Sequence, residues 1–316
     1  MKNSIFFYFI IVFGCRRSGT TLLRSMLEQH PALLVHPKEP QFILTLLERF
    51  GYTLRRKEKA VLALGKHPYL PENLDREALI AELADASLCI WPDLIHAYLL
   101  FWAKGQNGPA QIVLKDPAFT FQLDAVQTLF PEARYIHLVR HPYGNVSSQR
   151  ARWQNASVWE CAVWWKNAVA IGHHMAQMEP GHCLEVVYEE LVLDPAGTLR
   201  QICQFLEIPF VRQILDFTLE TISFSPEKPP EAKQFHGLDP ARLERWRDFL
   251  TAEDIRLIEY VCSAEMDWWQ YQKLTPAVNK LTFYGRLLRE WAGYVLLNNG
   301  RLLKKRLRQL KYRIMP

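Results

Sequence analysis

The sequence lacks several patterns that would assign a protein to a class at once. Its six cysteines form no Cys-x-x-Cys pair, and no group of cysteine and histidine has the spacing of a zinc site. Its ten histidines include no His-Glu-x-x-His motif, so no metal is predicted. The cysteines are interpreted as reduced thiols, which predicts a cytoplasmic protein. The chain also has no internal repeat and no low-complexity segment.

Acidic residues are almost missing from the C-terminal part of the chain. Residues 279–316 hold ten Lys and Arg against the single acid Glu290, a net charge of +9, which leaves −4 for residues 1–278 out of the formal total of +5. The basic charge therefore belongs to the tail and not to the body. A body built to wrap nucleic acid is disfavoured, and no nucleic-acid partner is predicted.

A long apolar run is also absent. The N-terminal run of residues 4–13 is ten residues long, whereas a membrane-spanning helix needs about 20. It leads directly into a loop flanked by glycines, without the spacer that a signal peptide would have. A signal peptide is the less favoured interpretation, and a buried parallel strand is predicted.

With 316 residues, of which 49% are hydrophobic, the chain can bury a full core. Strand-like and helix-like segments alternate, which predicts an α/β fold of the P-loop type, with three layers and a mostly parallel central sheet. Further strands are predicted at 32–36, 111–115, 134–139 and 182–188. Helices are predicted at 119–129, 143–153, 157–178, 195–206, 239–250 and 252–268.

Two segments stand apart from this alternation. Residues 51–108 are charged and helical in pattern, and are predicted to form a helical cap insertion within a domain of residues 1–275. Residues 276–316 are predicted to form an extension with a basic amphipathic C-terminal helix. Its part 301–314 can make peripheral contact with an anionic membrane, dock on the acidic body, or remain a frayed end.

The segment Gly14-x-x-x-x-Gly19-Thr20-Thr21 has the glycine spacing of a P-loop, whose backbone N–H groups converge on an anion at a helix N-terminus. Thr20 stands where a loop that hydrolyses ATP or GTP carries its lysine. Arg16, Arg17 and the two threonines instead offer donors to a smaller 5′-anion.

Residues 17–23, Arg-Ser-Gly-Thr-Thr-Leu-Leu, resemble the 5′-phosphosulfate loop of sulfotransferases that use 3′-phosphoadenosine-5′-phosphosulfate (PAPS). The form that begins with arginine is similar to that of tyrosylprotein sulfotransferases and their bacterial relatives. The resemblance extends over roughly residues 5–270. It implies that Arg17, Ser18, Gly19, Thr20 and Thr21 bind the 5′ end of PAPS.

A second anion site is predicted where the strand 134–139 ends at Arg140 and a helix begins with Pro142. In sulfotransferases an arginine and a serine eight residues later hold the 3′-phosphate, and Arg140 with Ser148 has that spacing. Arg152, one helical turn beyond Ser148, resembles a further contact in the tyrosylprotein branch. An arginine at a sheet edge and a serine in a helix could also be purely structural.

Sulfuryl transfer needs a base for the acceptor proton and a cation for the charge on the leaving phosphate. Residues 38–42, Lys-Glu-Pro-Gln-Phe, resemble the Lys-Glu-Pro-x-Phe segment of carbohydrate sulfotransferases, which implies Glu39 as the base, with His36 in reserve. Lys115 begins a Lys-Asp-Pro segment similar to the one that supplies the catalytic lysine of tyrosylprotein sulfotransferases. Asp116 either orients Lys115 and caps the next helix, or binds magnesium in a kinase.

Two weaker assignments also rest on the resemblance. Tyr188 is implied to lie near the adenine, although a buried core tyrosine is nearly as well supported. Arg245 belongs to an Arg-Trp pair that follows a polar loop in the family. Within that loop, Ser225, Lys228 and Lys233 remain unassigned.

Taken together, these residues predict an enzyme, a sulfotransferase that moves the sulfuryl group of PAPS to a hydroxyl of a carbohydrate, a lipid or a tyrosine or other phenol, without a metal. Two alternatives stay open. The first is a magnesium-dependent P-loop kinase, which would bind ATP. The second is a nucleotide-binding scaffold without turnover. The sequence does not identify the acceptor.

Overall fold

A computed structural model describes residues 8–104, 111–153, 156–217 and 238–296 of the chain. The polypeptide divides into two compact units. The first comprises residues 1–139 and 171–238, and the second comprises residues 140–170 and 239–316. No helix in the described part is both long enough and apolar enough to cross a lipid bilayer.

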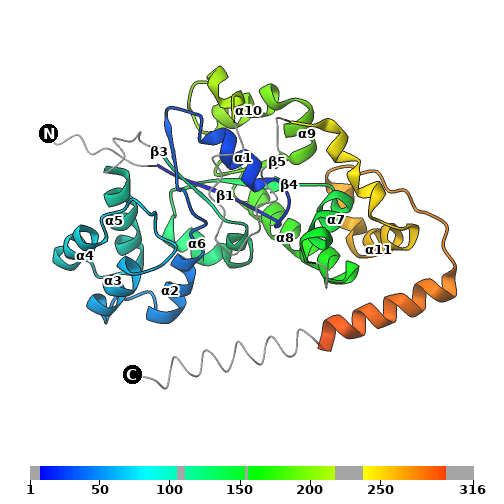
Figure 1. Cartoon of the computed structure of the whole chain (residues 1–316), viewed down its shortest axis with the longest axis horizontal. Coiled ribbons are helices and arrows are strands. Elements are labelled where there is room, and N and C mark those ends of the chain that lie inside the picture. The colour runs from blue at the N-terminus through cyan, green and yellow to red at the C-terminus, as the bar shows by residue number, and fades with distance from the viewer. Residues whose placement is uncertain (1–7, 105–110, 154–155, 218–237, 297–316) are drawn as a thin grey trace. The chain divides into compact units, whose positions relative to one another are not determined.

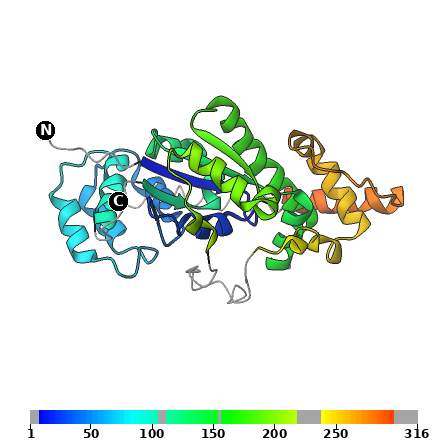
Figure 2. The ribbon, with the colours of Figure 1, turned by 90° about the horizontal axis from the view of Figure 1, so that it is seen from above.

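The first unit is built on a sheet of five strands, and every described pair in it is parallel. The strands follow the order β2-β3-β1-β4-β5 across the sheet. Figure 1 and Figure 2 show the sheet from two directions. Their bounds are β1 Tyr8–Gly14, β2 Leu33–Val35, β3 Gln111–Lys115, β4 Arg134–Val139 and β5 Cys183–Val187. The predicted α/β class with a mostly parallel sheet is confirmed.

Both faces of this sheet are covered, because side chains that alternate along β1 are buried on either side. Phe9 packs its ring 4.7 Å from that of His96 on α5 (Trp91–Lys104). Ile10 and Val12 point to the other face and are fully buried. On that face α1 (Thr20–Leu27) packs against β1, β2 and β3. In Figure 1 the sheet accordingly runs between α1 and α10 on one side and α6 on the other.

Further helices complete the first unit. The predicted cap is helical in its described part, where α5 follows two shorter helices. These and the remaining elements are α2 Phe42–Phe50, α3 Lys57–Gly65, α4 Arg76–Asp85, η1 Pro117–Gln122, α6 Leu123–Leu129, α9 Tyr188–Leu193, α10 Pro195–Phe205 and η2 Arg212–Leu215. Helix α8 (Val158–Met178) contributes residues to both units. The division into domains 1–275 and 276–316 stays a prediction.

The second unit contains α7 (Pro142–Arg152) and α11 (Ala252–Trp268). The helix predicted over 239–250 is wrong: two 3₁₀ helices, Pro240–Leu243 and Arg245–Asp248, occupy this segment. Trp246 and Leu250 are its buried hydrophobic residues, so little packing energy is available to hold a continuous α-helix.

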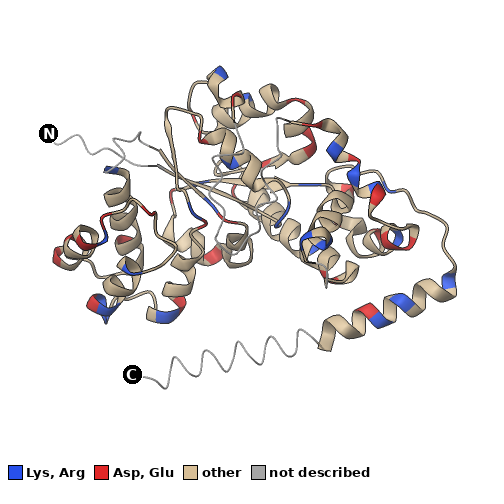
Figure 3. Ribbon diagram, viewed as in Figure 1, with Lys and Arg blue, Asp and Glu red and all other residues tan. Residues whose placement is uncertain are grey.

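Residues 280–296 form a helix that contacts α11 within the second unit. Arg286 Nη2 donates to Asp254 Oδ1 at 2.5 Å, and Phe283 is buried beside Tyr260. Basic residues of this helix are visible in Figure 3. The segment 301–314, for which membrane contact is predicted, lies outside the described residues.

Candidate active site

The predicted catalytic residues of the first unit follow the carboxyl ends of neighbouring strands. Lys115 ends β3, and Val12 of β1 is its Cα partner in the sheet. Glu39 comes four residues after the end of β2, the strand on the other side of β3. Since all these strands are parallel, their carboxyl ends meet at one edge, where ligands of open α/β sheets bind.

The loop between β1 and α1 has the backbone geometry of an anion cradle. Gly14 and Gly19 have φ values of 145° and 95°, and Arg17 adopts a left-handed φ of 68°. Thr120, 106 residues away, holds the first glycine in place: its Oγ1 accepts from Gly14 N at 3.1 Å and donates to Gly14 O at 3.0 Å. Successive left-handed and right-handed residues turn N–H groups toward a common point, which favours an anion.

Neighbouring atoms leave no room for a side chain at either glycine. A Cβ on Gly14 would lie 2.4 Å from the carbonyl oxygen of Leu138 on β4. A Cβ on Gly19 would lie 2.3 Å from the ring of Tyr188, which is buried at the start of α9. The Tyr188 ring therefore lies against Gly19 of the loop, and its contact with the adenine stays a prediction. Ser18 and Thr20 are buried in the same loop.

Lys115 and Glu39 form the central contact of the site. Lys115 Nζ lies 2.5 Å from Glu39 Oε1 and 3.4 Å from Thr21 Oγ1 of the loop. Burial lowers the pKa of Lys115, while the neighbouring Glu39 raises it. The structure thus brings together the predicted base, the predicted cation and the anion loop, although Glu39 and Lys115 are 76 residues apart in the chain.

Asp116 caps the element that follows it, which is one part of the first of its two predicted roles. Its Oδ1 accepts from Ala118 N at 2.8 Å and caps η1. Its Oδ2 is buried. Burial, and next the charge of Glu39, raises the pKa of Asp116 to about 7. A carboxyl group with such a pKa keeps its proton at pH values at which an ordinary aspartic acid has already lost it.

His36 is unsuited to act as a base. It is fully buried, with Nε2 2.8 Å from Tyr98 Oη of α5 and Nδ1 2.8 Å from the carbonyl oxygen of Lys38. Burial lowers the pKa of His36 to about 4. Both ring nitrogens are engaged, so this histidine fixes the strand end against the cap helix.

Arg24 is a charged residue of the site that the motif does not reveal. It lies on α1 with only 4% of its surface exposed. Burial lowers the pKa of Arg24, whereas Glu28 and then Glu39 raise it. Its Nη2 lies 3.4 Å from Glu28 Oε1, and its Nε is buried without a partner in the described structure. The available signal is an arginine set between the apolar pairs 22–23 and 26–27 of an amphipathic helix.

The residues predicted to hold a 3′-phosphate lie in the second unit. A Cβ on Gly144, in the first turn of α7, would lie 3.0 Å from Arg140 Nε. The guanidinium of Arg140 therefore covers the start of this helix. Ser148 and Arg152 follow Gly144 at intervals of four residues, so the three positions share one helix face. Trp165 Nε1 donates to Arg140 O at 2.8 Å and fixes the backbone there.

Two other predictions have different outcomes. Arg245 is exposed and lies over the ring of Phe249, with 5.8 Å from its guanidinium carbon to the ring centroid. Nothing in the described part of the chain assigns it a ligand. Ser225, Lys228 and Lys233 lie outside the described residues.

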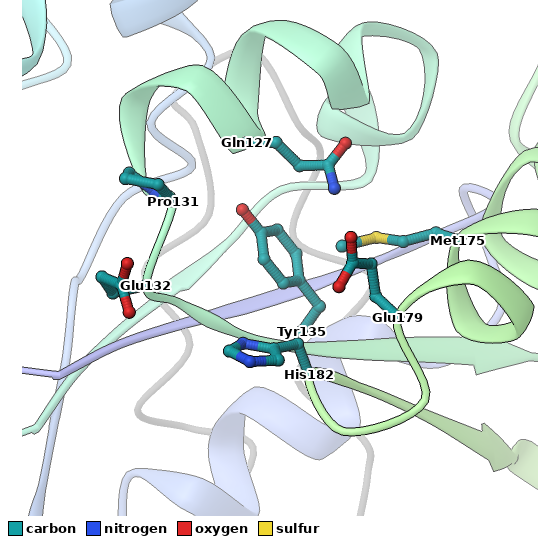
Figure 4. Close-up of a pocket in the computed structure, with 7 residues that line it drawn as sticks. All are labelled: Gln127, Pro131, Glu132, Tyr135, Met175, Glu179 and His182. Carbon is teal, nitrogen blue, oxygen red and sulfur yellow. The ribbon is translucent and has the colours of Figure 1, made fainter.

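A pocket of about 280 Å³ lies at the opposite edge of the sheet (Figure 4). Tyr135 near the start of β4 and His182 just before β5 contribute to its wall, with Glu132 and Glu179. It therefore lies at the amino ends of the strands, away from the loop, Lys115 and Glu39. Among the described residues no group of three His, Cys, Asp or Glu is arranged to hold a metal ion.

Comparisons with known proteins agree with this architecture. The chain is 28% identical over 213 residues to a protein-tyrosine sulfotransferase of Drosophila melanogaster, covering 65% of this chain and 39% of that protein. It is 27% identical over 215 residues to protein-tyrosine sulfotransferase 1 of Danio rerio, covering 65% of this chain and 55% of that protein. The match spans about half of these relatives or less.

A solved structure is also similar. The sulfotransferase domain of the olefin synthase of Synechococcus PCC 7002 superposes with a TM-score of 0.54 at 26% identity. The superposition covers 80% of this chain and 93% of that domain. The sequence profile of the sulfotransferase family matches residues 10–212, which is more than half of the chain. The chain therefore belongs to the sulfotransferase family.

Proposed function

We propose that this protein transfers the sulfuryl group of PAPS to the hydroxyl of an acceptor. The observation that carries the proposal is the contact of Lys115 with both Glu39 and Thr21 of the glycine loop. A cation, a carboxylate and an anion cradle are the groups that sulfuryl transfer requires, and here they lie within reach of one another.

In this proposal the donor is bound at both ends. The loop, with Arg16, Arg17, Ser18, Gly19, Thr20 and Thr21, binds the 5′-phosphosulfate through backbone N–H groups and side-chain donors. Arg140, Ser148 and Arg152 bind the 3′-phosphate, and Tyr188 lies against the adenine. The shared face of Gly144, Ser148 and Arg152 under the Arg140 guanidinium supports the 3′-phosphate assignment. Arg245 stays a prediction.

The chemistry is a displacement at sulfur. The acceptor oxygen forms a bond to sulfur while the bond from sulfur to the 5′-phosphate oxygen breaks, and adenosine 3′,5′-bisphosphate leaves with the electron pair. Glu39 takes the proton of the acceptor hydroxyl. Lys115 stabilises the charge that develops on the leaving oxygen, and buried Arg24 adds positive charge nearby.

The ion pair of Glu39 with Lys115 affects the order in which donor and acceptor bind. In the free protein Glu39 and Lys115 neutralise each other, so neither is ready for its role. A bound phosphosulfate offers Lys115 a second anion and releases Glu39 to accept a proton. Donor binding is therefore expected to precede productive binding of the acceptor.

A thermal-shift experiment tests the proposal. Adenosine 3′,5′-bisphosphate in EDTA should raise the melting temperature, whereas ATP with magnesium should do little. The reverse pattern would favour a kinase. Incubation with PAPS and a panel of sugars, lipids and phenols, read by mass spectrometry, should then show a product gaining SO₃. Tight binding of the bisphosphate without a sulfated product from any acceptor would instead indicate a scaffold.

Arg140 offers a sharper version of this test. Arg140→Ala should abolish the thermal shift with adenosine 3′,5′-bisphosphate, because the 3′-phosphate loses its guanidinium. Arg242→Ala, which changes a half-buried arginine that lies near Asp239, is the matched control and should keep the shift. The acceptor class, the cytoplasmic location and the absence of a metal stay predictions.

A further inference from the structure

The helix of residues 280–296 carries a stripe of exposed apolar side chains. Leu281, Tyr284, Leu288, Trp291 and Val295 are separated by three, four, three and four residues, so they lie on one face of the helix. The exposed fractions reach 85% at Leu281, 64% at Leu288 and 49% at Trp291. Isolated surface hydrophobic residues are ordinary, but a continuous stripe marks a contact surface.

The opposite face of the same helix is fixed to the second unit. Arg286 contacts Asp254 on α11 and donates from Nε to Glu290 Oε1 at 2.8 Å. Glu290 Oε2 accepts from Trp159 N at 2.8 Å. Phe283 is buried on this side. These contacts set the rotation of the helix about its axis, and they turn the apolar stripe away from α11 and into solvent.

Positive charge borders the stripe. Lys280 and Arg289 are exposed and lie on its two sides when the residues are spaced at 100° per residue. Glu290 is the one acid of residues 279–316, and it is engaged by Arg286 and Trp159. The exposed charged residues of the described helix, Lys280 and Arg289, are therefore both positive.

We infer that this face lies on the surface of an anionic lipid bilayer. An apolar stripe flanked by Lys and Arg is the chemistry of a helix that lies in the membrane interface, and Trp291 and Tyr284 suit the boundary between headgroups and acyl chains. A second copy of the chain fits less well, because a symmetric contact would oppose two cationic surfaces. The surface does not depend on the proposed enzyme activity or on the predicted contact of 301–314.

Vesicle sedimentation of the full chain tests this inference. The wild-type protein should pellet with phosphatidylcholine vesicles that contain phosphatidylserine, and less with phosphatidylcholine alone. The double variant Leu288→Ser with Trp291→Ser should lower the partition coefficient by about tenfold or more, because two buried apolar side chains are lost from the interface. The charge reversals Lys280→Glu with Arg289→Glu should weaken the preference for phosphatidylserine.

The matched control changes two apolar residues elsewhere that are at least as exposed as Leu288 and Trp291. Met178 and Leu193 are 67% and 65% exposed, and Met178→Ser with Leu193→Ser should leave sedimentation unchanged. Melting curves show whether each variant is folded, which is expected since all four side chains are exposed. Equal sedimentation of the stripe variant and wild type would overturn the inference. So would a wild-type dimer in analytical ultracentrifugation that the stripe variant abolishes while neither protein binds vesicles.

Discussion

Asp116→Asn should change how the stability of the protein depends on pH. Burial, followed by the charge of Glu39, raises the pKa of Asp116 from its usual 3.8 to about 7. At pH values between these two pKa values, Asp116 keeps its proton in the folded protein and has lost it in the unfolded chain. The stability from this group is therefore fully present below about pH 4, and it is lost as the pH rises through about 7.

The size of the effect follows from the same values. A rise of about 3 in the pKa of Asp116 corresponds to about 4 kcal/mol between its two protonation states. Asparagine keeps an oxygen that can accept from Ala118 N and carries no charge, so the variant lacks this pH dependence. Relative to wild type, the free energy of unfolding of the variant should rise by about 4 kcal/mol between about pH 4 and about pH 8.

Urea unfolding at a series of pH values measures this difference directly. Asp124→Asn, which removes an exposed carboxylate from α6, controls for the loss of one negative charge. Groups that titrate alike in wild type and variant contribute equally to both free energies of unfolding, so their contributions cancel in the difference. A difference between Asp116→Asn and wild type that stays constant from about pH 4 to about pH 8 would refute the reasoning about burial.

Three further substitutions test the site. Glu39→Gln should keep the thermal shift with adenosine 3′,5′-bisphosphate and lower the rate of sulfuryl transfer by about 10²-fold to 10⁴-fold. A rate near that of wild type would show that Glu39 is not the base. Gly19→Ala should lower the free energy of unfolding more than Gly181→Ala. The left-handed φ of Gly19 costs about 1–2 kcal/mol for alanine and its Cβ would meet the ring of Tyr188, whereas nothing lies within 4 Å of a Cβ at Gly181. Equal losses in urea unfolding would contradict the clash. Thr120→Val leaves Gly14 N and O without their side-chain partner. It should lower the free energy of unfolding by about 1–3 kcal/mol in the same assay and weaken the binding of the bisphosphate. Unchanged stability and binding would show that this hydroxyl does not support the loop.

Much of the sheet could be predicted from local sequence. The strands expected at 111–115 and 134–139 are found with those bounds, and those expected at 32–36 and 182–188 are one residue longer at each end than β2 and β5. Buried parallel strands are short continuous apolar runs, so their signal lies within a few neighbouring residues. The helix expected at 252–268 also has its predicted bounds, because Thr251 and Asp254 form a capping box.

Predictions were weaker where packing selects among local conformations. The helix expected at 119–129 begins as the 3₁₀ helix Pro117–Gln122 before α6. Asp116 caps its start and Thr120 within it bonds to Gly14. That bond ties the segment to β1, and no property of the segment alone encodes it.

The sequence by itself determined the order of strands and helices along the chain, the glycines of the loop, and which side chains of the loop can bind an anion. Dihedral preferences and hydrophobic periodicity act over a few residues, so local sequence carries this information. Only the tertiary structure decided that Lys115 pairs with Glu39, that His36 is held by Tyr98, and that Arg24 is enclosed. These contacts depend on β3 lying between β1 and β2. The spatial order of parallel strands is set by packing across the whole core, which local sequence does not specify.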